Sequence, residues 1–205
     1  MTAILKVDTI QDTSGNNIIN ESSDTITIGA SGDTTNIIGT LQNNGAAVAT
    51  TNGITEADQW RITANHTSAS ILTSNWERND STGYSKIGTG LSESSGVFSF
   101  ATTGIYLINF YGAAQMAATD GYINFYLQVT TNNSSFSTGA TGLAGNDASS
   151  GDAGGTAANA YIFDVTNTST HKFHFGLGSV TSGTYLTGSS TESFTGFTVI
   201  RLGDT

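Results

Sequence analysis

The three histidines are the side chains of this sequence best suited to acid–base or metal chemistry, because imidazole changes charge near neutral pH. They are His66, His171 and His174. His171 and His174 stand three positions apart near one expected strand, and side chains an odd number apart on a strand point to opposite faces. They therefore cannot act as paired ligands. We expect the histidines to be exposed or at strand edges, with a metal or catalytic role as the less favoured alternative.

An oxygen-rich loop is the second candidate for chemistry. Residues 145–155 read GNDASSGDAGG and offer the carboxylate, amide and hydroxyl oxygens that calcium binds. The spacing does not follow the EF-hand loop, which ends in a bidentate glutamate. We expect a solvated loop, with calcium binding or contact with a ligand as the alternative, and no other cofactor.

Motifs that would indicate an enzyme are absent from the sequence. Residues 88–90 and 139–142 are rich in glycine, but no lysine follows them as in a phosphate-binding loop. The sequence contains neither G-x-S-x-G nor H-E-x-x-H. Scattered aspartates and glutamates leave a pair of glycosidase carboxylates open. We expect no enzymatic activity and keep a polysaccharide depolymerase as the less favoured alternative.

Two tryptophans, Trp60 and Trp76, could stack on sugars. Large aromatic side chains more often lie in a core or at a subunit interface, because burial removes a large apolar area from water. We therefore expect both to be core or interface residues.

The composition limits which partners the chain can have. It has 205 residues, a formal net charge of −10, 11% charged residues and no cysteine or proline. An acidic surface repels phosphate, so neither nucleic acid nor an anionic membrane is an expected partner. We see no secretory signal and no apolar run long enough to cross a bilayer. We expect a chain made in a cytoplasm that leaves it, if at all, as part of a larger assembly.

Many short apolar segments separated by Gly, Asn, Asp and Ser predict an all-β protein. The segment 105–111 is apolar at nearly every position, so we expect both of its faces to be covered. Such a pattern is typical of an antiparallel sandwich or jelly roll. The expected strands of the main domain lie near residues 59–63, 71–76, 96–100, 104–114, 122–130, 135–141, 159–166, 172–180 and 193–202.

The front of the chain differs in character from the rest. Residues 1–20 contain an extended apolar segment, which we expect to dock onto a partner through Leu5, Val7 and Ile10. Residues 21–53 hold short strands punctuated by Gly and Asn, without aromatic residues. One copy could bury too little apolar surface to offset its ordering entropy. We predict a β-stem formed by identical chains around one axis, or else a linker. Residues 54–205 form the expected jelly-roll head.

Three segments of the head carry a family resemblance. Residues 96–100 read GVFSF, residues 103–108 read TGIYLI and residues 194–200 read FTGFTVI. They resemble the strand pair G-x-F-x-F…P-G-x-Y and the closing strand in the globular heads of complement component one, subcomponent q, which belong with the tumour-necrosis-factor superfamily. Thr103 stands where that family usually has proline. The resemblance implies a trimeric jelly roll over residues 57–205.

The front of the chain resembles a different group. Residues 5–11 read LKVDTIQ, and the segments ITIG at 26–29 and NIIGTL at 36–41 follow them. They look like the opening of fibre and appendage proteins of tailed bacteriophages, notably marine ones. The segments QWRIT at 59–63 and SNWER at 74–78 look like the heads of such phage proteins. Together the resemblances imply a homotrimeric virion protein, bound to another virion protein by its N-terminus.

The two resemblances together imply a tail fibre, spike or capsid-decoration protein whose head contacts a host-surface glycan or protein or stabilises the particle. A free carbohydrate-binding, lectin-like module is the alternative. The expected core or trimer-packing residues are aromatic: Trp60, Trp76, Phe98, Phe100, Tyr106, Phe110, Phe125, Phe175, Phe194 and Phe197.

Overall fold

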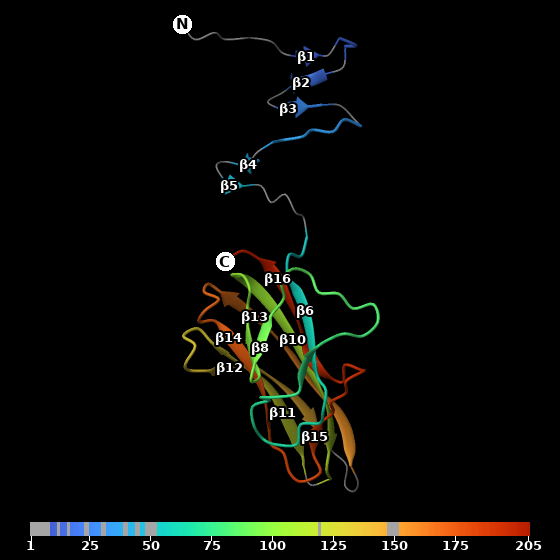
Figure 1. Cartoon of the computed structure of the whole chain (residues 1–205), viewed down its shortest axis with the longest axis vertical. Coiled ribbons are helices and arrows are strands. Elements are labelled where there is room, and N and C mark those ends of the chain that lie inside the picture. Colours follow the sequence, from blue (N-terminus) through green and yellow to red (C-terminus); the bar gives the residue numbers. More distant parts are fainter. Residues whose placement is uncertain are drawn as a thin grey trace. The chain divides into compact units, whose positions relative to one another are not determined.

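The computed structural model describes residues 9–11, 13–15, 17–22, 25–29, 32–38, 41–43, 46–47, 53–118, 120–146 and 152–205. Every regular element within these residues is a β-strand. The chain divides into two compact units, Met1–Asn52 and Gly53–Thr205 (Figure 1).

The described residues of the first unit contain five short strands in two small antiparallel sheets. A three-stranded sheet has the order β1-β2-β3, and a two-stranded sheet joins β4 to β5. The strands are β1 (Thr9–Gln11), β2 (Asn17–Ser22), β3 (Thr25–Ile28), β4 (Gln42–Asn43) and β5 (Ala46–Ala47). Within the segment 21–53, for which we expect short strands, residues 35–38 are described and belong to no strand.

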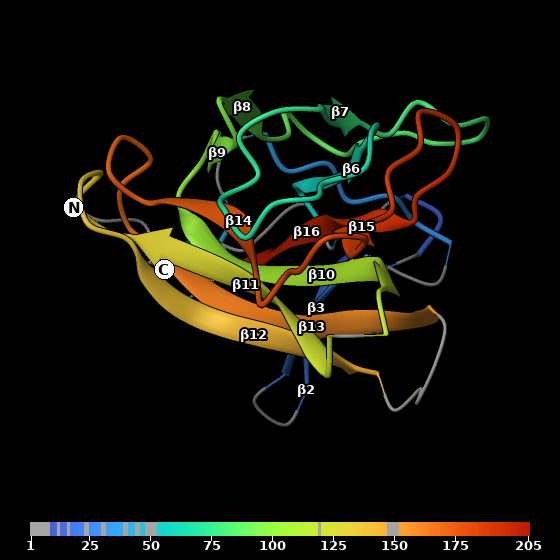
Figure 2. The same cartoon turned by 90° about the horizontal axis from the view of Figure 1, so that it is seen from below.

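The second unit is an antiparallel jelly-roll sandwich of two sheets (Figures 1 and 2). One sheet has the order β13-β10-β16-β6-β7, with β15 also paired to β10; it is called here the β10 sheet. The other has the order β12-β11-β14-β9-β8 and is called the β14 sheet. The strands are β6 (Ala57–Ile62), β7 (Trp76–Arg78), β8 (Ser92–Ser94), β9 (Val97–Ser99), β10 (Gly104–Met116), β11 (Tyr122–Thr130), β12 (Ser137–Gly145), β13 (Ala153–Val165), β14 (Lys172–Gly178), β15 (Tyr185–Leu186) and β16 (Thr195–Gly203).

Alternating burial along β10 shows how the sequence builds the sandwich. Tyr106, Ile108 and Phe110 are buried between the sheets, whereas Leu107 and Tyr111 point to the other side and are only partly buried. Side chains alternate between faces along a strand. Because both sets are apolar, β10 buries one face in the sandwich and leaves a second apolar face outward.

Aromatic rings from both sheets meet in the centre of the sandwich. Phe98 is fully buried, stacks on Phe173 at 5.2 Å and meets the edge of Phe197 at 4.7 Å. Trp60 and Trp76 also present their rings edge-on to Phe98. Rings packed in this way combine a large buried area with favourable edge-to-face contacts. Phe98 therefore joins β9 and β14 to β6, β7 and β16.

Gly96 is the glycine on which the entry into β9 depends most. Its φ is +80°, and a Cβ built there would lie 2.1 Å from the carbonyl oxygen of Leu72. Only glycine adopts such a backbone at no steric cost and allows this approach. The turn Ser94–Val97 can therefore pass directly against the segment around Leu72.

The strand expected at residues 71–76 is wrong. Ile71 forms a single bridge with Gly176, and the chain then turns at Asn75, whose φ is +65°. Regular pairing begins only at Trp76, opposite Ile62. The segment is apolar without being a regular strand, because its Leu72 is buried in the core.

Candidate functional site

The outward face of the β10 sheet is the most apolar surface of the second unit. Leu107 pairs in register with Ile162 of β13 on one side and Ile200 of β16 on the other, and Ile200 pairs with Ala57 of β6. All four residues lie at least partly exposed, and 61% of Ile162 is open to solvent. A row of four apolar side chains therefore crosses four strands; it is called here the outward apolar row.

The nearest positions on one side of this row carry no charge, whereas on the other side the exposed Asp164 pairs with Ile105. The uncharged outward row joins Ala160, Asn109, Thr198 and Gln59 in register. The row beyond it contains Tyr111 opposite Ala158. Monomeric proteins rarely leave contiguous apolar patches of this kind uncovered, and such patches mark interaction sites. The face has the chemistry of an interface between proteins.

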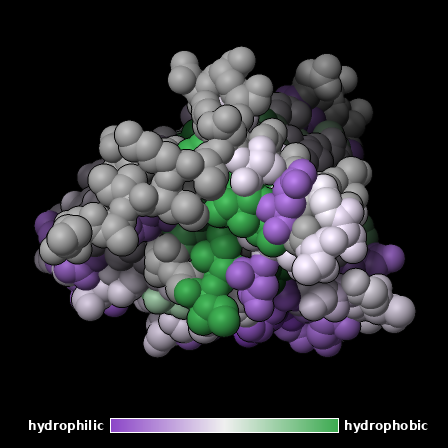
Figure 3. Space-filling model, turned by 90° about the horizontal axis from the view of Figure 1, so that it is seen from above, coloured by the Kyte–Doolittle hydropathy of each residue, from purple (hydrophilic) through white to green (hydrophobic). Residues whose placement is uncertain are grey.

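The first unit also exposes an apolar row. Ile10 pairs with Ile19, and Ile19 pairs with Ile28, across the three strands of its larger sheet. Their exposed fractions are 39%, 37% and 56%. In the view of Figure 3, apolar residues, in green, lie next to one another at the surface. One copy of this small sheet cannot cover its own isoleucines.

Asp58 is the most heavily hydrogen-bonded acid of the structure. It is 3% exposed and accepts from Trp60 Nε1 at 3.0 Å, Tyr84 OH at 2.7 Å and the backbone nitrogen of Leu91 at 2.9 Å. Arg78 Nε donates to both carboxylate oxygens, at 3.1 and 3.2 Å. Burial by itself would raise the pKa of Asp58, but these donors together hold it below its ordinary value.

The contact between Tyr84 and Asp58 lowers the pKa of Asp58 but raises the pKa of Tyr84. Burial and the hydrogen bond to Asp58 raise the pKa of Tyr84 to about 12. A shallow hollow of about 230 Å³ lies beside the pair, lined by Ala57, Asp58, Gln59, Tyr84, Ser85 and Thr198. Both Asp58 oxygens already accept several hydrogen bonds from within the protein. The carboxylate is therefore a clamp that joins β6, β7 and the loop between β7 and β8, and it is poorly placed to move a proton to a substrate.

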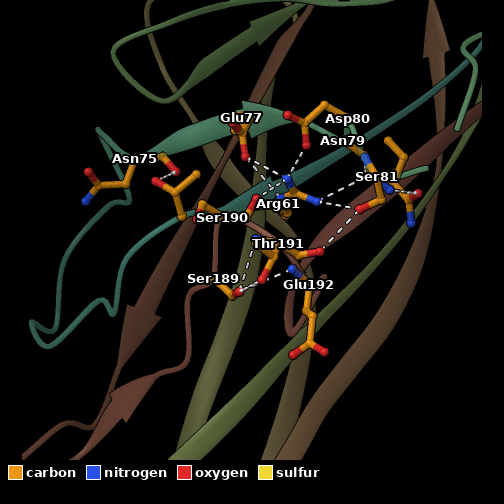
Figure 4. A network of polar contacts seen from close by, with 12 residues as sticks. Arg61, Asn75, Glu77, Asn79, Asp80, Ser81, Ser189, Ser190, Thr191 and Glu192 are labelled. Carbon is orange, nitrogen blue, oxygen red and sulfur yellow. Dashed lines mark hydrogen bonds and ion pairs between the residues drawn. The ribbon is translucent and has the colours of Figure 1, made fainter.

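Arg61 is a second clamp, and it is fully buried (Figure 4). Its guanidinium forms an ion pair with Glu77 at 2.9 Å and another with Asp80. It also donates to Asn79 Oδ1 at 3.0 Å, to Ser81 Oγ at 2.8 Å and to the carbonyl of Ser190. A buried charge is stable only when it is paired and hydrogen-bonded in this way. Arg61 ties the loop after β7 to the loop before β16.

Asp120 forms a third polar cluster, in the turn that follows β10. It accepts hydrogen bonds from the Thr184 hydroxyl and, at 3.0 Å, from the Thr181 backbone nitrogen. Burial acts to raise its pKa, but these hydrogen bonds hold the pKa of Asp120 below its ordinary value. Thr184 also bonds the Ala117 nitrogen at 2.9 Å, so the cluster fixes the turn after β10.

From the sequence we expect His171 and His174 to be exposed or at a strand edge. The expected exposure is wrong, because each side chain is only 8% exposed. His171 stacks on Phe163, 5.7 Å between ring centroids, near the core. His174 lies under Phe136, 4.1 Å away, and bonds Gln128 at 2.8 Å. Aromatic stacking that the sequence spacing does not reveal covers both rings. Burial lowers the pKa of His174, which keeps this ring neutral.

The predicted aromatic residues fall into three groups. Trp76 is half-buried against the core, and Phe194 is 42% exposed and lies outside it. The others are all buried in the core: Trp60, Phe98, Phe100, Tyr106, Phe110, Phe125, Phe175 and Phe197. The guanidinium of Arg78 lies over the Trp60 ring at 4.6 Å. The two tryptophans therefore offer no open platform to a sugar.

The remaining predicted residues lie outside or next to the limits of the described residues. Leu5 and Val7 lie outside the described residues, as do positions 147–151 of the oxygen-rich loop. Ile10 belongs to β1 and is exposed. Across the described ranges, no three His, Asp or Glu side chains are grouped to hold a metal ion. In the same part of the chain, no helix is long and apolar enough to span a membrane.

Comparison with solved structures shows which fold this is. The chain is similar to murine APRIL in a crystal structure at pH 8.5, with 12% sequence identity and a TM-score of 0.51 over 72% of this chain and 98% of that one. It is also similar to Eiger TNF from S. frugiperda, with 14% identity and a TM-score of 0.51 over 73% of this chain and 93% of that one. The fold is a TNF-like jelly roll. No protein-family model matches the chain, and no curated protein matches its sequence.

Sequence reasoning missed the two polar clamps. Arg61 and Asp58 lie three positions apart in β6, and their partners in the sequence segment 77–91 are too far along the chain to be paired by spacing alone. The available signal was an aspartate and an arginine in one short strand beside Trp60 and Ile62, because a charge that is buried requires partners.

Proposed function

We propose that this chain is a non-enzymatic structural component of a bacteriophage virion, a tail fibre, spike or capsid-decoration protein. Its N-terminal segment attaches to another virion protein, and its head is displayed as a trimer for host-surface adhesion or particle stabilisation. The segments LKVDTIQ, ITIG and NIIGTL support the phage assignment through their resemblance to phage fibre proteins. On this proposal the protein is made in the host cytoplasm and functions in the virion.

The single observation that carries the proposed assembly is the outward apolar row Ile162–Leu107–Ile200–Ala57. It starts at β13, which is an edge strand of its sheet. A closed ring of identical chains covers both an apolar face and an edge, because each copy presents the same surfaces to its neighbours. The TNF-like fold supports three as the number of copies, since the family that the head resembles is trimeric.

The first unit supports the same assembly. Its row of Ile10, Ile19 and Ile28 is exposed to solvent in the single chain. Three copies that turn this row toward a common axis would bury nine isoleucines. Burial of this size could offset the ordering entropy of a segment too small to fold alone.

The polar clamps favour a structural role. Asp58, Arg61 and Asp120 are each held by several partners from the protein itself, which leaves them poorly placed for acid–base chemistry. A trimeric head presents three identical loops and faces to a surface. Three weak contacts then act together with high avidity.

Labelled particles test the virion role directly. Antibodies raised against the chain and tagged with gold should decorate purified particles at a fixed position in electron micrographs. Deleting residues 1–20 should abolish incorporation and leave a head that still unfolds cooperatively. Particles that are never labelled, or that incorporate the truncated chain normally, would contradict the proposal.

A further inference from the structure

Two glycines occupy neighbouring outward positions in the middle of the β14 sheet. Phe173, Phe175 and Leu177 of β14 point into the core, so Gly176 and Gly178 face outward. β14 lies in the middle of its sheet, between β11 and β9. Glycine weakens a central strand, and it often marks a place where another group approaches the backbone closely.

Side chains of β11 approach both glycines. Tyr126 is paired with Gly176, and a Cβ on that glycine would lie 2.3 Å from the tyrosine Cζ. Asn124 is paired with Gly178, where a Cβ would lie 2.4 Å from Asn124 Oδ1. The phenol ring therefore lies over the backbone of β14 and stays half-exposed. Any larger residue than glycine would push the ring or the amide away.

The side-chain amide of Asn124, next to Tyr126 on β11, lacks a hydrogen bond at its oxygen. Asn124 Oδ1 is buried and has no hydrogen-bond partner within the structure. A buried acceptor without a partner is costly, and native structures rarely keep one without a reason. The oxygen has almost no accessible surface where it lies against Gly178, so a ligand's donor can reach it only when the amide turns outward, and that donor would then supply the missing hydrogen bond.

Apart from Leu143 of β12, which pairs with Asn124 and is 64% exposed, the surroundings are polar and almost uncharged. Tyr122, which is 54% exposed, lies four residues before Tyr126 on the same face, a distance of about 13 Å along the strand. Gln128 follows on that face and bonds His174 and Thr138. Lys172 is the only residue with a permanent charge at the outward positions of β11 and β14. We call the set Tyr122, Asn124, Tyr126, Gly176 and Gly178 the tyrosine face.

We propose that the tyrosine face binds a neutral sugar, with a pyranose ring stacked on Tyr126 and a hydroxyl donating to Asn124. Sugars present apolar C–H faces and hydroxyl donors together, and this pairs with a flat aromatic ring beside an amide acceptor. The net charge of −10 disfavours acidic glycans over neutral ones. The proposal rests on the adhesive role given above and names the ligand class for it.

The position of the tyrosine face fits this role. It belongs to the β14 sheet, whereas the outward apolar row belongs to the β10 sheet. The two sheets expose their outward faces on opposite sides of the sandwich. Association through the β10 sheet therefore leaves three tyrosine faces open, as a multivalent adhesin requires.

Binding of the full-length chain to immobilised neutral oligosaccharides of glucose, galactose and mannose, with polygalacturonate as the acidic probe, tests the site. We expect binding to at least one neutral glycan. Tyr126→Ala should weaken it about tenfold or more, whereas the matched control Tyr126→Phe, which keeps the ring, should bind within about threefold of wild type. Binding to polygalacturonate alone, to no neutral glycan, or equally by wild type and Tyr126→Ala would overturn the proposal.

Two further measurements separate a binding role from a structural one. Asn124→Ala removes an unpaired polar atom, so its unfolding temperature should equal or exceed that of wild type while glycan binding falls. Loss of both stability and binding would overturn the role of Asn124. Particles carrying Tyr126→Ala that adsorb to host cells normally would refute the sugar site alone. Particles lacking the chain altogether that adsorb normally would refute the adhesive function itself.

Discussion

Replacing Ile162 by aspartate should dissociate the assembly without unfolding the head. Ile162 is 61% exposed in the single chain, so the substitution removes little from the core. Full burial of such a side chain contributes about 1.5–3 kcal/mol, so burying the exposed part at an interface contributes about 1–2 kcal/mol per copy. Three copies lose about 3–6 kcal/mol, which corresponds to about 10²–10⁴-fold in the dissociation constant of the trimer. Burying the new carboxylate adds to that loss.

Sedimentation velocity over a range of concentrations measures this effect, and Leu143→Asp is the matched control. Leu143 is 64% exposed but lies on β12, in the β14 sheet. We expect Ile162→Asp to sediment as a monomer at concentrations where wild type and Leu143→Asp remain assembled. An Ile162→Asp variant that assembles as tightly as wild type, or a Leu143→Asp variant that dissociates equally, would refute the assignment of the interface to the β10 sheet.

Three further predictions concern the stability of the head. Phe98→Ala should lower the free energy of unfolding by about 3–5 kcal/mol in urea titrations, because it removes the ring at the centre of the core, and a loss below about 1 kcal/mol would contradict that position. Arg61→Met should cost about 1–3 kcal/mol in the same assay, because Glu77 and the carbonyl of Ser190 lose their charged hydrogen-bond donor, and an unchanged midpoint would show that the clamp is dispensable. Asp58 has a folded pKa below its ordinary value of 3.8, so its contribution is complete above that pH and is lost as the pH falls further. Asp58→Asn should therefore flatten the fall in unfolding free energy below that pH, and an unchanged slope would contradict the sign of the shift.

Part of the fold can be predicted from the sequence, because the composition of some segments indicates a buried strand. The segment 105–111 is apolar at nearly every position, which indicates a strand covered on both sides. The structure gives β10 as Gly104–Met116, so the strand is confirmed, but its second face is outward and only partly buried in the single chain, which differs from the expected cover on both faces. The similarly apolar segment 122–130 corresponds to β11. In both cases a nearly continuous run of apolar residues marks the strand.

Other features depend on contacts between distant segments and leave no local pattern. β8 is too short and too polar to be recognised from the sequence. β15 has only two residues and is equally hard to recognise, although it pairs with β10. His174 is buried only because Phe136, from the loop before β12, folds over it. The tyrosine face depends on the register that places Tyr126 opposite Gly176, and register is set by the whole sheet.

The mass of the full-length chain in solution tests the central claim most directly. One chain has a mass of 21.1 kDa, so native mass spectrometry should show a single species of three chains, about 63 kDa. The same species should persist on dilution, because the apolar surfaces of both units would be buried within it. A stable monomer of 21.1 kDa across the accessible concentrations would contradict the account.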